Sequence, residues 1–524
     1  MTVRTRIAPS PTGDPHVGTG YMGLVNMVLA RQHGGQFLLR IDDTDRTRYR
    51  AGSEQAVFDA LRWLGLEWDE GPDKGGPCGP YRQSERTAIY LEHALMLVKS
   101  GHAYRCFCTS DELAARRAEA LAEKRDFRGY DGRCRALDPE DAERRAGEPH
   151  VIRFKCPTDE GKTVIQDLLR GPIETPNAEL DDKVLLKSDG FPTYHLASVV
   201  DDHLFRISHI IRAEEWIPSG PLHQLLFEAY GWDVPVFCHM PLIRNADKSK
   251  ISKRKNPTSL LYYRDAGYLP QALLNFLGLL GWGGPKTADG GNQEIFSVDD
   301  MLQHFKLETL SLGGPVFDLA KLRHVNAHYL RELQPQAFAQ QVRDYLVGDP
   351  AYLEALVPLV SPRMETLGQF LHVADFFFSD VDHVHPDDRK LKPGSVKRLV
   401  EGLVPAGVEP EDAWFTLSQL SGALERLDAW TAAELEQALR GPGAVALSDW
   451  KPRDLFMALR VAISGRKETP GLFECLEVLG KSRVLGRLAD AMRVLPAPGK
   501  KRLKKLEKAR DARIAGAATE ASDA

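Results

Sequence analysis

Two short segments, far apart along the chain, carry side chains that could bind and activate a nucleoside triphosphate. The first, RIAPSPTGDPHVGT at positions 6–19, places an imidazole and a glycine where a helix is expected to begin. The second, DKSKISKRK at positions 247–255, carries four lysines. A helix N-terminus offers amide donors and a favourable dipole to phosphate, and a lysine-rich loop can close over a leaving group. Together they predict donors placed where charge develops when a carboxylate attacks the α-phosphate of ATP.

Three residues of these segments are expected to carry the chemistry. His16 can bond to phosphate from the first helical turn, while Lys250 and Lys253 can neutralise the departing pyrophosphate. Gly18 would let the nucleotide approach the backbone closely. Magnesium would arrive with the triphosphate, and no protein nucleophile is required.

The same segments resemble the two signatures of class I aminoacyl-tRNA synthetases. PSPTGDPHVGT is similar to their His-Ile-Gly-His motif, and KISKR at 250–254 is similar to their Lys-Met-Ser-Lys-Ser loop. The amino-acid sequence resembles that of the bacterial glutamyl-tRNA synthetase family over about residues 3–490. Further segments that carry the resemblance are RIDDTDRTRY (40–49), GPYRQSER (79–86), LLKSDGFPTYHLASVVDDHL (185–204), IRAEEW (211–216), SLGGPVFDLAKL (311–322) and ETPGLFE (468–474).

This resemblance implies an ATP-dependent ligase acting on L-glutamate and tRNA(Glu). Glutamate would become glutamyl-adenylate, and the glutamyl group would then move to the 3′ end of the tRNA. By position, the resemblance also implies the residues that bind ATP. They are Gly18, Thr19, Glu215, Lys250, Ser252, Lys253 and Arg254.

A glutamate pocket needs cationic forks for two carboxylates and an acid for the α-ammonium. Arg6 and Arg212 are the candidate forks, because arginine can pair with a carboxylate through two parallel hydrogen bonds. The alternative is that both arginines form surface salt bridges. The other pocket positions that the resemblance implies are Ala8, Ser10, Asp42, Tyr194 and Ser198.

Two pocket positions depart from the family's usual pattern. Asp42 stands where the family generally has glutamate, and Ser198 stands where asparagine is frequent. The shorter acid lacks one methylene of reach, so a water could mediate its contact with the ammonium. The neighbouring Asp43 and Asp45 could equally be capping or solvated residues.

Two groups of residues invite a metal-site interpretation that we do not favour. Cys106, Cys108 and Cys134 match a zinc site found in some members of the family, but Ala136 stands at the fourth ligand position. Structural zinc normally needs four ligands, so we expect reduced core cysteines and no metal, with Tyr130 or His150 as candidate substitutes. Asp201, Asp202 and His203 are expected to be solvated residues of a turn at a strand end.

Four C-terminal residues resemble the anticodon contacts of the family. They are Arg363, Arg460, Thr469 and Leu472. An arginine at position 363 is similar to the form that accepts tRNA(Glu) and rejects tRNA(Gln). The alternative is that Arg363 binds only phosphate.

The pattern of predicted elements indicates a multidomain chain. Residues 3–8 and 37–41 read as strands around an intervening helix, an alternation typical of a doubly wound parallel sheet. Beyond residue 325 strand signals largely disappear. With the resemblance, we expect a Rossmann-type catalytic domain with an inserted acceptor-binding subdomain, followed by all-α stem-contact and anticodon-binding domains. The expected segments are 1–100 and 192–245 (catalytic), 101–191 (insert), 246–325 (KISKR loop and stem contact), 326–498 (anticodon binding) and 499–524 (basic, disordered tail).

The amino-acid composition is compatible with a multidomain tRNA synthetase but would not by itself predict one. The chain has 524 residues, and its 68 Lys and Arg against 73 Asp and Glu give a net charge of −5, so any RNA surface must be a local patch. Seven cysteines, an odd number, favour a reducing compartment. The apolar stretch at 269–284 is shorter than the roughly 20 residues that span a bilayer. We expect a soluble, cytoplasmic monomer.

Other functions fit the residues less well. Gly18, Gly20 and Gly23 form a G-x-G-x-x-G pattern, but prolines separate it from the preceding strand, which disfavours an NAD oxidoreductase. A catalytically silent RNA-binding paralogue would not need both signatures intact. A synthetase that also charges tRNA(Gln) is the remaining alternative.

Overall fold

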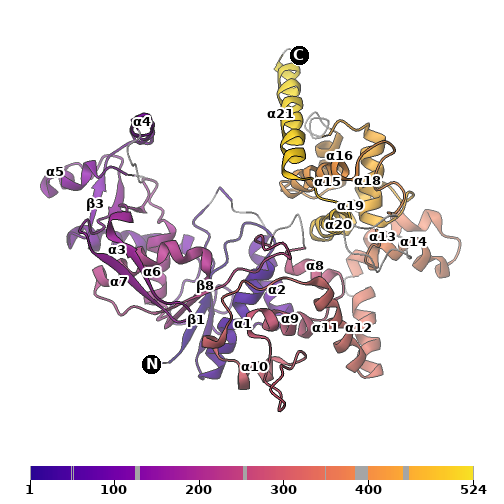
Figure 1. Cartoon of the computed structure of the whole chain (residues 1–524), viewed down its shortest axis with the longest axis horizontal. Coiled ribbons are helices and arrows are strands. Elements are labelled where there is room, and N and C mark those ends of the chain that lie inside the picture. Colours follow the sequence, from indigo (N-terminus) through magenta and orange to yellow (C-terminus); the bar gives the residue numbers. More distant parts are fainter. Residues whose placement is uncertain are drawn as a thin grey trace. The chain divides into compact units, whose positions relative to one another are not determined.

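The chain divides into two compact units, one mixed and one helical. The computed structural model describes residues 2–45, 47–48, 50, 52–123, 130–251, 257–347, 350–383, 399–440 and 448–522. Unit 1 comprises Met1–Ile243 and Leu274–Pro315, and unit 2 comprises Arg244–Leu273 and Val316–Ala524. Among the described residues, every strand lies in unit 1 (Figure 1). The predicted class, an α/β part followed by an all-α part, is therefore confirmed.

Unit 1 alternates strands and helices along the chain. Its strands are β1 (Arg4–Ile7), β2 (Gln36–Leu39), β3 (Ala103–Cys106), β4 (Val151–Phe154), β5 (Lys162–Asp167), β6 (Gly171–Pro176), β7 (Val184–Leu186), β8 (His209–Ala213) and β9 (Val236–Met240). Its helices are α1 (Val17–Gln32), α2 (Ser53–Trp63), α3 (Thr87–Lys99), α4 (Ser110–Ala122), α5 (Pro139–Arg144), α6 (Tyr194–Leu204), α7 (Gly220–Tyr230) and α10 (Val298–His304).

Two parallel strand pairs, in two sheets that lie side by side, carry candidate site residues of unit 1. β1 pairs with β2, and β8 pairs with β9, both in parallel. The amide of Ser208 donates to the carbonyl of Arg4 at 2.9 Å, which places the start of β8 beside β1. All four strands are largely buried and rich in β-branched or aromatic residues, as expected where helices cover a parallel sheet. Ligands of such sheets lie at the carboxyl ends of the strands.

The inserted region is not a separate body. β3, β4 and β7 form one antiparallel sheet, but the β5–β6 hairpin joins β9 to give the strand order β6-β5-β9-β8. One hairpin of the predicted insert therefore extends the catalytic sheet. The boundaries predicted at residues 101 and 191 stay predictions.

Unit 2 is built from helices around one apolar core. Its helices are α8 (Leu260–Asp265), α11 (Leu319–Glu332), α12 (Pro335–Val347), α13 (Pro350–Val360), α14 (Phe370–Phe378), α15 (Pro410–Glu425), α16 (Ala432–Arg440), α18 (Pro452–Ser464), α19 (Leu472–Leu479), α20 (Lys481–Val494) and α21 (Lys500–Ser522), while α9 (Pro270–Trp282) begins in unit 2 and continues into unit 1. Leu417, Leu459, Leu476 and Leu488 are fully buried in this core and come from four different helices.

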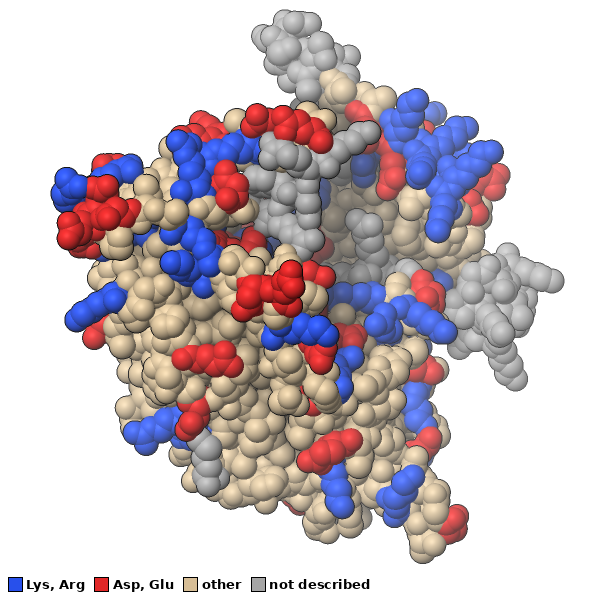
Figure 2. Space-filling model, turned by 60° about the vertical axis from the view of Figure 1, so that its left-hand side comes forward, with Lys and Arg blue, Asp and Glu red and all other residues tan. Residues whose placement is uncertain are grey.

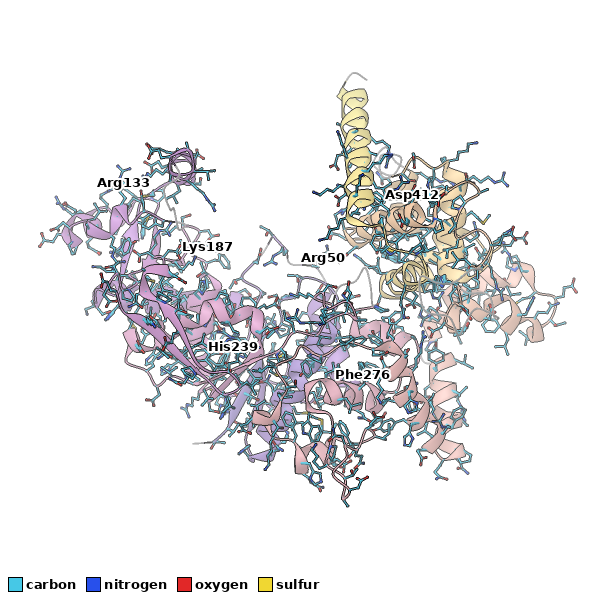
Figure 3. All side chains as sticks on the ribbon, in the orientation of Figure 1. Arg50, Arg133, Lys187, His239, Phe276 and Asp412 are labelled. Atoms are coloured by element: carbon cyan, nitrogen blue, oxygen red, sulfur yellow. The ribbon has the colours of Figure 1, made fainter. Side chains whose placement is uncertain are left out.

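The basic C-terminus departs from the expected disordered tail, because Lys500–Ser522 forms the helix α21. Two contacts tie it to α15. The Arg502 guanidinium makes a two-pronged ion pair with Asp412, and Arg510 donates to the Gln419 side chain at 3.1 Å. Figure 3 labels Asp412 at this place. The abundant Lys, Leu, Ala and Arg of α21 also have high helix propensity, which composition-based reasoning about disorder undervalued.

Candidate active site

His16 caps the helix that follows the first signature. It is the N-cap residue of α1, and its Nδ1 accepts a hydrogen bond from the Gly18 amide at 3.0 Å. An accepting Nδ1 is unprotonated, so the neutral ring carries its proton on Nε2. A Cβ at position 18 would lie 3.1 Å from His16 Nδ1, which gives glycine a structural reason at this position. Thr19 lies in the same turn and donates its amide to the His16 carbonyl at 2.7 Å.

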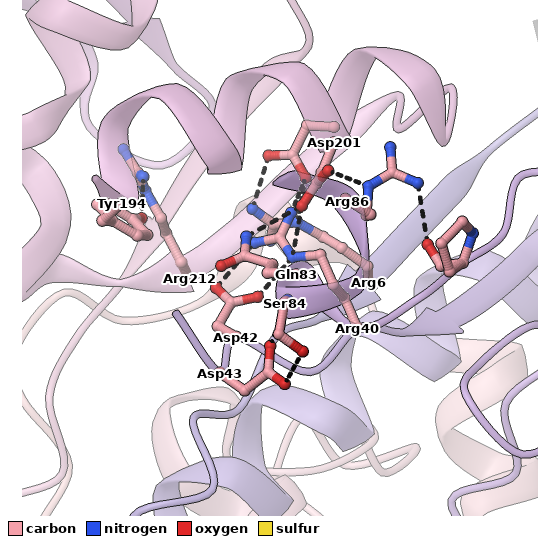
Figure 4. A network of polar contacts seen from close by, with 12 residues as sticks. Arg6, Arg40, Asp42, Asp43, Gln83, Ser84, Arg86, Tyr194, Asp201 and Arg212 are labelled. Carbon is pink, nitrogen blue, oxygen red and sulfur yellow. Dashed lines mark hydrogen bonds and ion pairs between the residues drawn. The ribbon is translucent and has the colours of Figure 1, made fainter. Parts of the chain in front are cut away.

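Arg6 and Asp42 meet in a buried network of ion pairs at the carboxyl ends of β1 and β2 (Figure 4). Arg6 donates through Nε and Nη2 to Asp202, both at 2.9 Å, and its Nη1 makes no hydrogen bond to another described residue. Arg40 binds Asp42 through two hydrogen bonds of 2.6 and 3.0 Å and reaches Asp202 at 3.1 Å. Burial raises the pKa of Asp42 to about 6, although the Arg40 guanidinium lowers it. Asp42 is thus tied to the protein rather than freely presented.

Asp201 anchors the other half of this network. Its carboxylate accepts from Arg86 at 2.7 Å, from the Tyr90 hydroxyl at 2.9 and 3.0 Å and from Gln83 at 3.0 Å. Asp201 and Asp202 are 0% and 1% exposed and lie inside α6. The prediction that they are solvated acids of a turn at a strand end is therefore wrong. Sequence reasoning missed that buried arginines, distant in the chain, would need them.

Arg212 is a buried arginine next to this network that has no carboxylate partner within hydrogen-bonding distance among the described residues. It lies in β8 and is 7% exposed. Its Nε donates to His239 Nε2 at 3.0 Å, and its Nη1 donates to the Tyr194 hydroxyl at 2.9 Å. Its Nη2 is buried and finds no hydrogen-bond acceptor in the described chain. An unpaired buried guanidinium nitrogen is costly, so this geometry suits an anionic ligand.

Ser198 adds a second unpaired group in the same region. Its hydroxyl is fully buried in α6 and finds no partner in the described part of the chain. Tyr194 begins α6 and packs against Trp216, with 4.4 Å between the ring centres. Ala8 is half-buried directly after β1, while Ser10 is exposed.

The two remaining acids next to Asp42 have local roles. Asp43 accepts from the amide of Ser84 at 2.8 Å and from its hydroxyl at 2.6 Å. Asp45 is a half-exposed carboxylate that accepts from Thr47, which lowers its pKa to about 2. The capping interpretation fits Asp43, and the solvated one fits Asp45.

Only part of the second signature can be placed. Ser252, Lys253 and Arg254 lie outside the described residues. Lys250 is exposed and follows a tight turn in which the Asn245 side chain donates to its carbonyl at 2.9 Å. Glu215 is exposed in the short helix Glu214–Ser219 after β8.

The three candidate zinc cysteines do lie together. The sulfurs of Cys106, Cys108 and Cys134 are all within 4.8 Å of one another. The Tyr130 hydroxyl lies 3.3 Å from Cys106 and 3.9 Å from Cys108, whereas Ala136 is exposed and offers no donor. Three sulfurs and one oxygen fit the donor number of a zinc site. Of the two substitutes considered from sequence, the structure brings Tyr130 to the cluster.

The four candidate anticodon residues all belong to unit 2. Arg460 donates to the carbonyls of Thr469 and Pro470 at 3.3 and 3.0 Å and so holds the turn before α19. Arg363 is exposed at the end of the short helix Ser361–Arg363. Burial raises the pKa of Cys475 to about 12, and the charges of Arg460 and Arg363 lower it. Leu472 is buried at the start of α19.

Several site residues escaped sequence reasoning. Arg40, Asp202 and His239 complete the pocket, yet no spacing rule links positions so far apart. Only Arg40 carried a signal, as a polar residue at the end of a predicted buried strand, where parallel sheets gather ligands; Asp202 lies inside α6 and His239 inside β9. Among the described residues, no helix is long and apolar enough to cross a membrane.

Comparison with known proteins identifies the family. Residues 2–324 match the model of tRNA synthetases class I (E and Q), catalytic domain, and residues 337–492 match an anticodon binding domain. The chain is 47% identical over 512 residues to a glutamate–tRNA ligase of Ectopseudomonas mendocina, covering 97% of this chain and 98% of the relative. It is 46% identical over 508 residues to that of a Psychrobacter species, covering 97% and 96%.

A solved structure agrees over nearly the full length. It is a glutamate tRNA ligase from Elizabethkingia meningosepticum in complex with its amino acid, similar with a TM-score of 0.61 and 32% identity over 95% of this chain and 100% of that one. The chain belongs to the glutamate–tRNA ligase family of the class I tRNA synthetases.

Proposed function

We propose that this protein is a glutamate–tRNA ligase that charges tRNA(Glu) and rejects tRNA(Gln). In the first step, the α-carboxylate of L-glutamate attacks the α-phosphate of ATP, a new O–P bond forms and pyrophosphate leaves. In the second, a hydroxyl of the terminal adenosine of tRNA attacks the activated carbonyl and AMP leaves. The chain supplies binding, orientation and charge stabilisation for both steps.

The single observation that supports this proposal best is the unpaired edge of Arg212. Glutamate carries a side-chain carboxylate, and Arg212 Nη2 is a buried donor without a partner among the described residues. Arg6 Nη1 and the Ser198 hydroxyl are further donors of the pocket. Asp42 would attract the α-ammonium, with a water bridging the shorter side chain.

The nucleotide would lie against the start of α1. The His16 ring would carry its proton on Nε2, and the positive end of the helix dipole of α1 favours phosphate. Gly18 and Thr19, with Glu215, would contact the nucleotide. Lys250, Ser252, Lys253 and Arg254 would close over the triphosphate, and Mg²⁺ would accompany ATP as part of the substrate.

The other segments receive roles from the family. The insert at 101–191 would hold the acceptor end of tRNA, residues 246–325 the stem and residues 326–498 the anticodon. Arg363, Arg460, Thr469 and Leu472 would form the anticodon contacts. We propose a monomer as the active form.

The test is a charging assay with purified glutamate and glutamine tRNAs, each with glutamate and with glutamine as the amino acid. Replacing Arg212 by Ala should raise the KM for glutamate and leave the KM for ATP unchanged, because a hydrogen bond to a charged group contributes about 1.5–3 kcal/mol. Arg31→Ala is a matched control, since Arg31 forms a half-exposed pair with Asp69. Failure of the unmodified protein to charge tRNA(Glu) would refute the proposal, and equal charging of tRNA(Gln) would refute discrimination alone.

A further inference from the structure

Three buried polar side chains form a line from β5 through β9 to β8. The Asp167 Oδ2 lies 2.7 Å from His239 Nδ1, and His239 Nε2 lies 3.0 Å from Arg212 Nε. His239 is 0% and Asp167 4% exposed. Figure 3 labels His239 within the α/β part of the chain.

The hydrogen bonds fix which nitrogen of His239 carries the proton. An arginine Nε only donates, so His239 Nε2 must accept, and Nδ1 must then donate to Asp167. Burial lowers the pKa of His239, which favours this neutral ring. The ring also faces the guanidinium of Arg170 and lies near the imidazole of His223, while Asp167 is its acidic neighbour.

Asp167 itself is held in place by backbone amides. Its Oδ1 accepts from Leu169 and Arg170 at 3.0 Å each, and its Oδ2 also accepts from the His239 amide at 2.9 Å. The carboxylate therefore cannot rotate without losing several hydrogen bonds. Its orientation selects the tautomer of His239.

We propose that Asp167 and His239 are positioning residues that aim the free edge of Arg212 at the substrate's side-chain carboxylate. This rests on the proposed function and deepens it. The Nε of Arg212 is held by His239 and its Nη1 by Tyr194, so the plane of the guanidinium is fixed. The Nη2 donor then has a fixed direction, and a substrate atom opposite it must be a hydrogen-bond acceptor. A carboxylate accepts there, whereas the amide nitrogen of glutamine would oppose a donor.

The decisive variant is Asp167→Asn, which keeps the size of the side chain. Its oxygen can still accept from the Leu169 and Arg170 amides, which leaves its NH2 facing both His239 Nδ1 and the His239 amide. The His239 imidazole must then carry its proton on Nε2. Two donors, His239 Nε2–H and Arg212 Nε–H, would face each other and the hydrogen bond between them would be lost. We expect the KM for glutamate to rise about tenfold or more, the KM for ATP and kcat to stay near their original values, and the preference for glutamate over glutamine to fall.

Two substitutions at His239 provide the matched pair. His239→Gln keeps one acceptor and one donor and should retain most of the glutamate affinity, whereas His239→Leu removes both and should behave like Asp167→Asn. Unchanged glutamate KM and unchanged selectivity in Asp167→Asn and His239→Leu would overturn the proposal. An equal loss of ATP binding, or no rescue by glutamine, would assign the pair to general stability. Absence of charging by the unmodified protein would instead refute the proposed function.

A separate observation concerns the exposed side of α21. Five lysines, here called the lysine face, lie at helical spacing and are all exposed: Lys500, Lys501, Lys504, Lys505 and Lys508. None forms an ion pair with another described residue. Arg502 and Arg510 point to α15 on the opposite side, and with Leu506 and Ala509 the inner side of α21 meets a cavity of about 550 Å³.

Like charges on one helix face repel one another, so this arrangement costs free energy unless an anion covers it. On the face that Figure 2 shows, acidic and basic side chains are interspersed, and the net charge of the chain is −5, so a polyanion needs a local patch. We propose that the lysine face contacts the phosphate backbone of tRNA. Such contacts release counterions and therefore make affinity depend on salt.

The test is the salt dependence of tRNA binding to the full chain. Changing all five lysines to glutamine should flatten the plot of log Kd against log salt by about 0.7–0.9 for each phosphate that the variant no longer neutralises. Changing them to arginine keeps the charge and should keep the slope. If the slope of log Kd for tRNA against log salt is unchanged in the glutamine variant, the proposal is overturned. This holds even if the variant no longer binds anionic vesicles or acidic proteins, because the lysine face would then have another partner.

Discussion

At the scale of residues, three of the four arginines in this network are paired with carboxylates, and the fourth is not. Arg6, Arg40 and Arg86 face three buried aspartates through direct hydrogen bonds. Arg212 is the fourth arginine and bonds only to neutral side chains in the described part of the chain. Burying an unpaired charge is expensive, so the unpaired state of Arg212 costs stability, and a bound anion at its Nη2, as proposed above, would offset that cost.

The pH dependence of glutamate binding should report on Asp42. Burial raises the pKa of Asp42 to about 6, so the carboxylate loses its charge as the pH falls through this value and no longer attracts the α-ammonium. We expect the KM for glutamate to rise below about pH 6 while the KM for ATP changes little. Initial rates between about pH 5 and 8 measure both constants.

Two variants decide whether Asp42 is responsible. Asp42→Asn should remove the inflection and give a high glutamate KM at every pH. Asp45→Asn is the control, because Asp45 is half-exposed and its pKa of about 2 leaves it charged throughout this range. An inflection that survives in Asp42→Asn would assign the titration to another group.

At the scale of elements, sequence periodicity located the strands well. The predictions at 3–8 and 37–41 correspond to Arg4–Ile7 and Gln36–Leu39, because short buried strands flanked by turn residues leave a clear pattern. The joining of β5 to β9 was missed, since pairing between strands so far apart in the chain has no local signal. Arg6 and Arg212 could be chosen from the sequence. Their partners Asp202 and His239 could not, because contacts between residues so far apart in the chain also leave no local signal.

The cysteine cluster gives an element-scale prediction about metal content. The expectation of no zinc rested on Ala136, and Tyr130 now provides an oxygen beside the three sulfurs. We expect protein purified without chelator to carry about one zinc per chain, measured by elemental analysis, and Cys108→Ala to lose it. Tyr130→Phe removes only the oxygen and should retain zinc more weakly.

Two results would restore the interpretation as reduced core cysteines. One is the absence of zinc in the unmodified protein under reducing conditions. The other is a melting temperature of the unmodified protein that does not change when zinc is added or removed, because a structural metal stabilises the fold that binds it.

At the scale of the whole molecule, the anticodon-binding-domain match at residues 337–492 falls in unit 2, while most of the catalytic-domain match at residues 2–324 falls in unit 1. The composition and helical periodicity beyond residue 325 were enough to predict an all-α region. The identity of its contact residues came from the family resemblance and not from any physical pattern. Arg363 is exposed, so it can meet a base or a phosphate.

Arg363 should separate the two tRNA classes. A guanidinium donates several hydrogen bonds in one plane to a single base edge, whereas an amide both donates and accepts and can satisfy more than one base. Arg363→Gln should therefore raise charging of tRNA(Gln) relative to tRNA(Glu), measured as the ratio of kcat/KM values, with the KM for glutamate unchanged. Arg363→Lys is the matched control, because it keeps the charge and loses the planar fork. A different outcome would show that Arg363 binds phosphate and does not read the anticodon. In that case Arg363→Lys keeps full discrimination, whereas Arg363→Gln weakens the binding of both tRNAs equally and flattens its salt dependence.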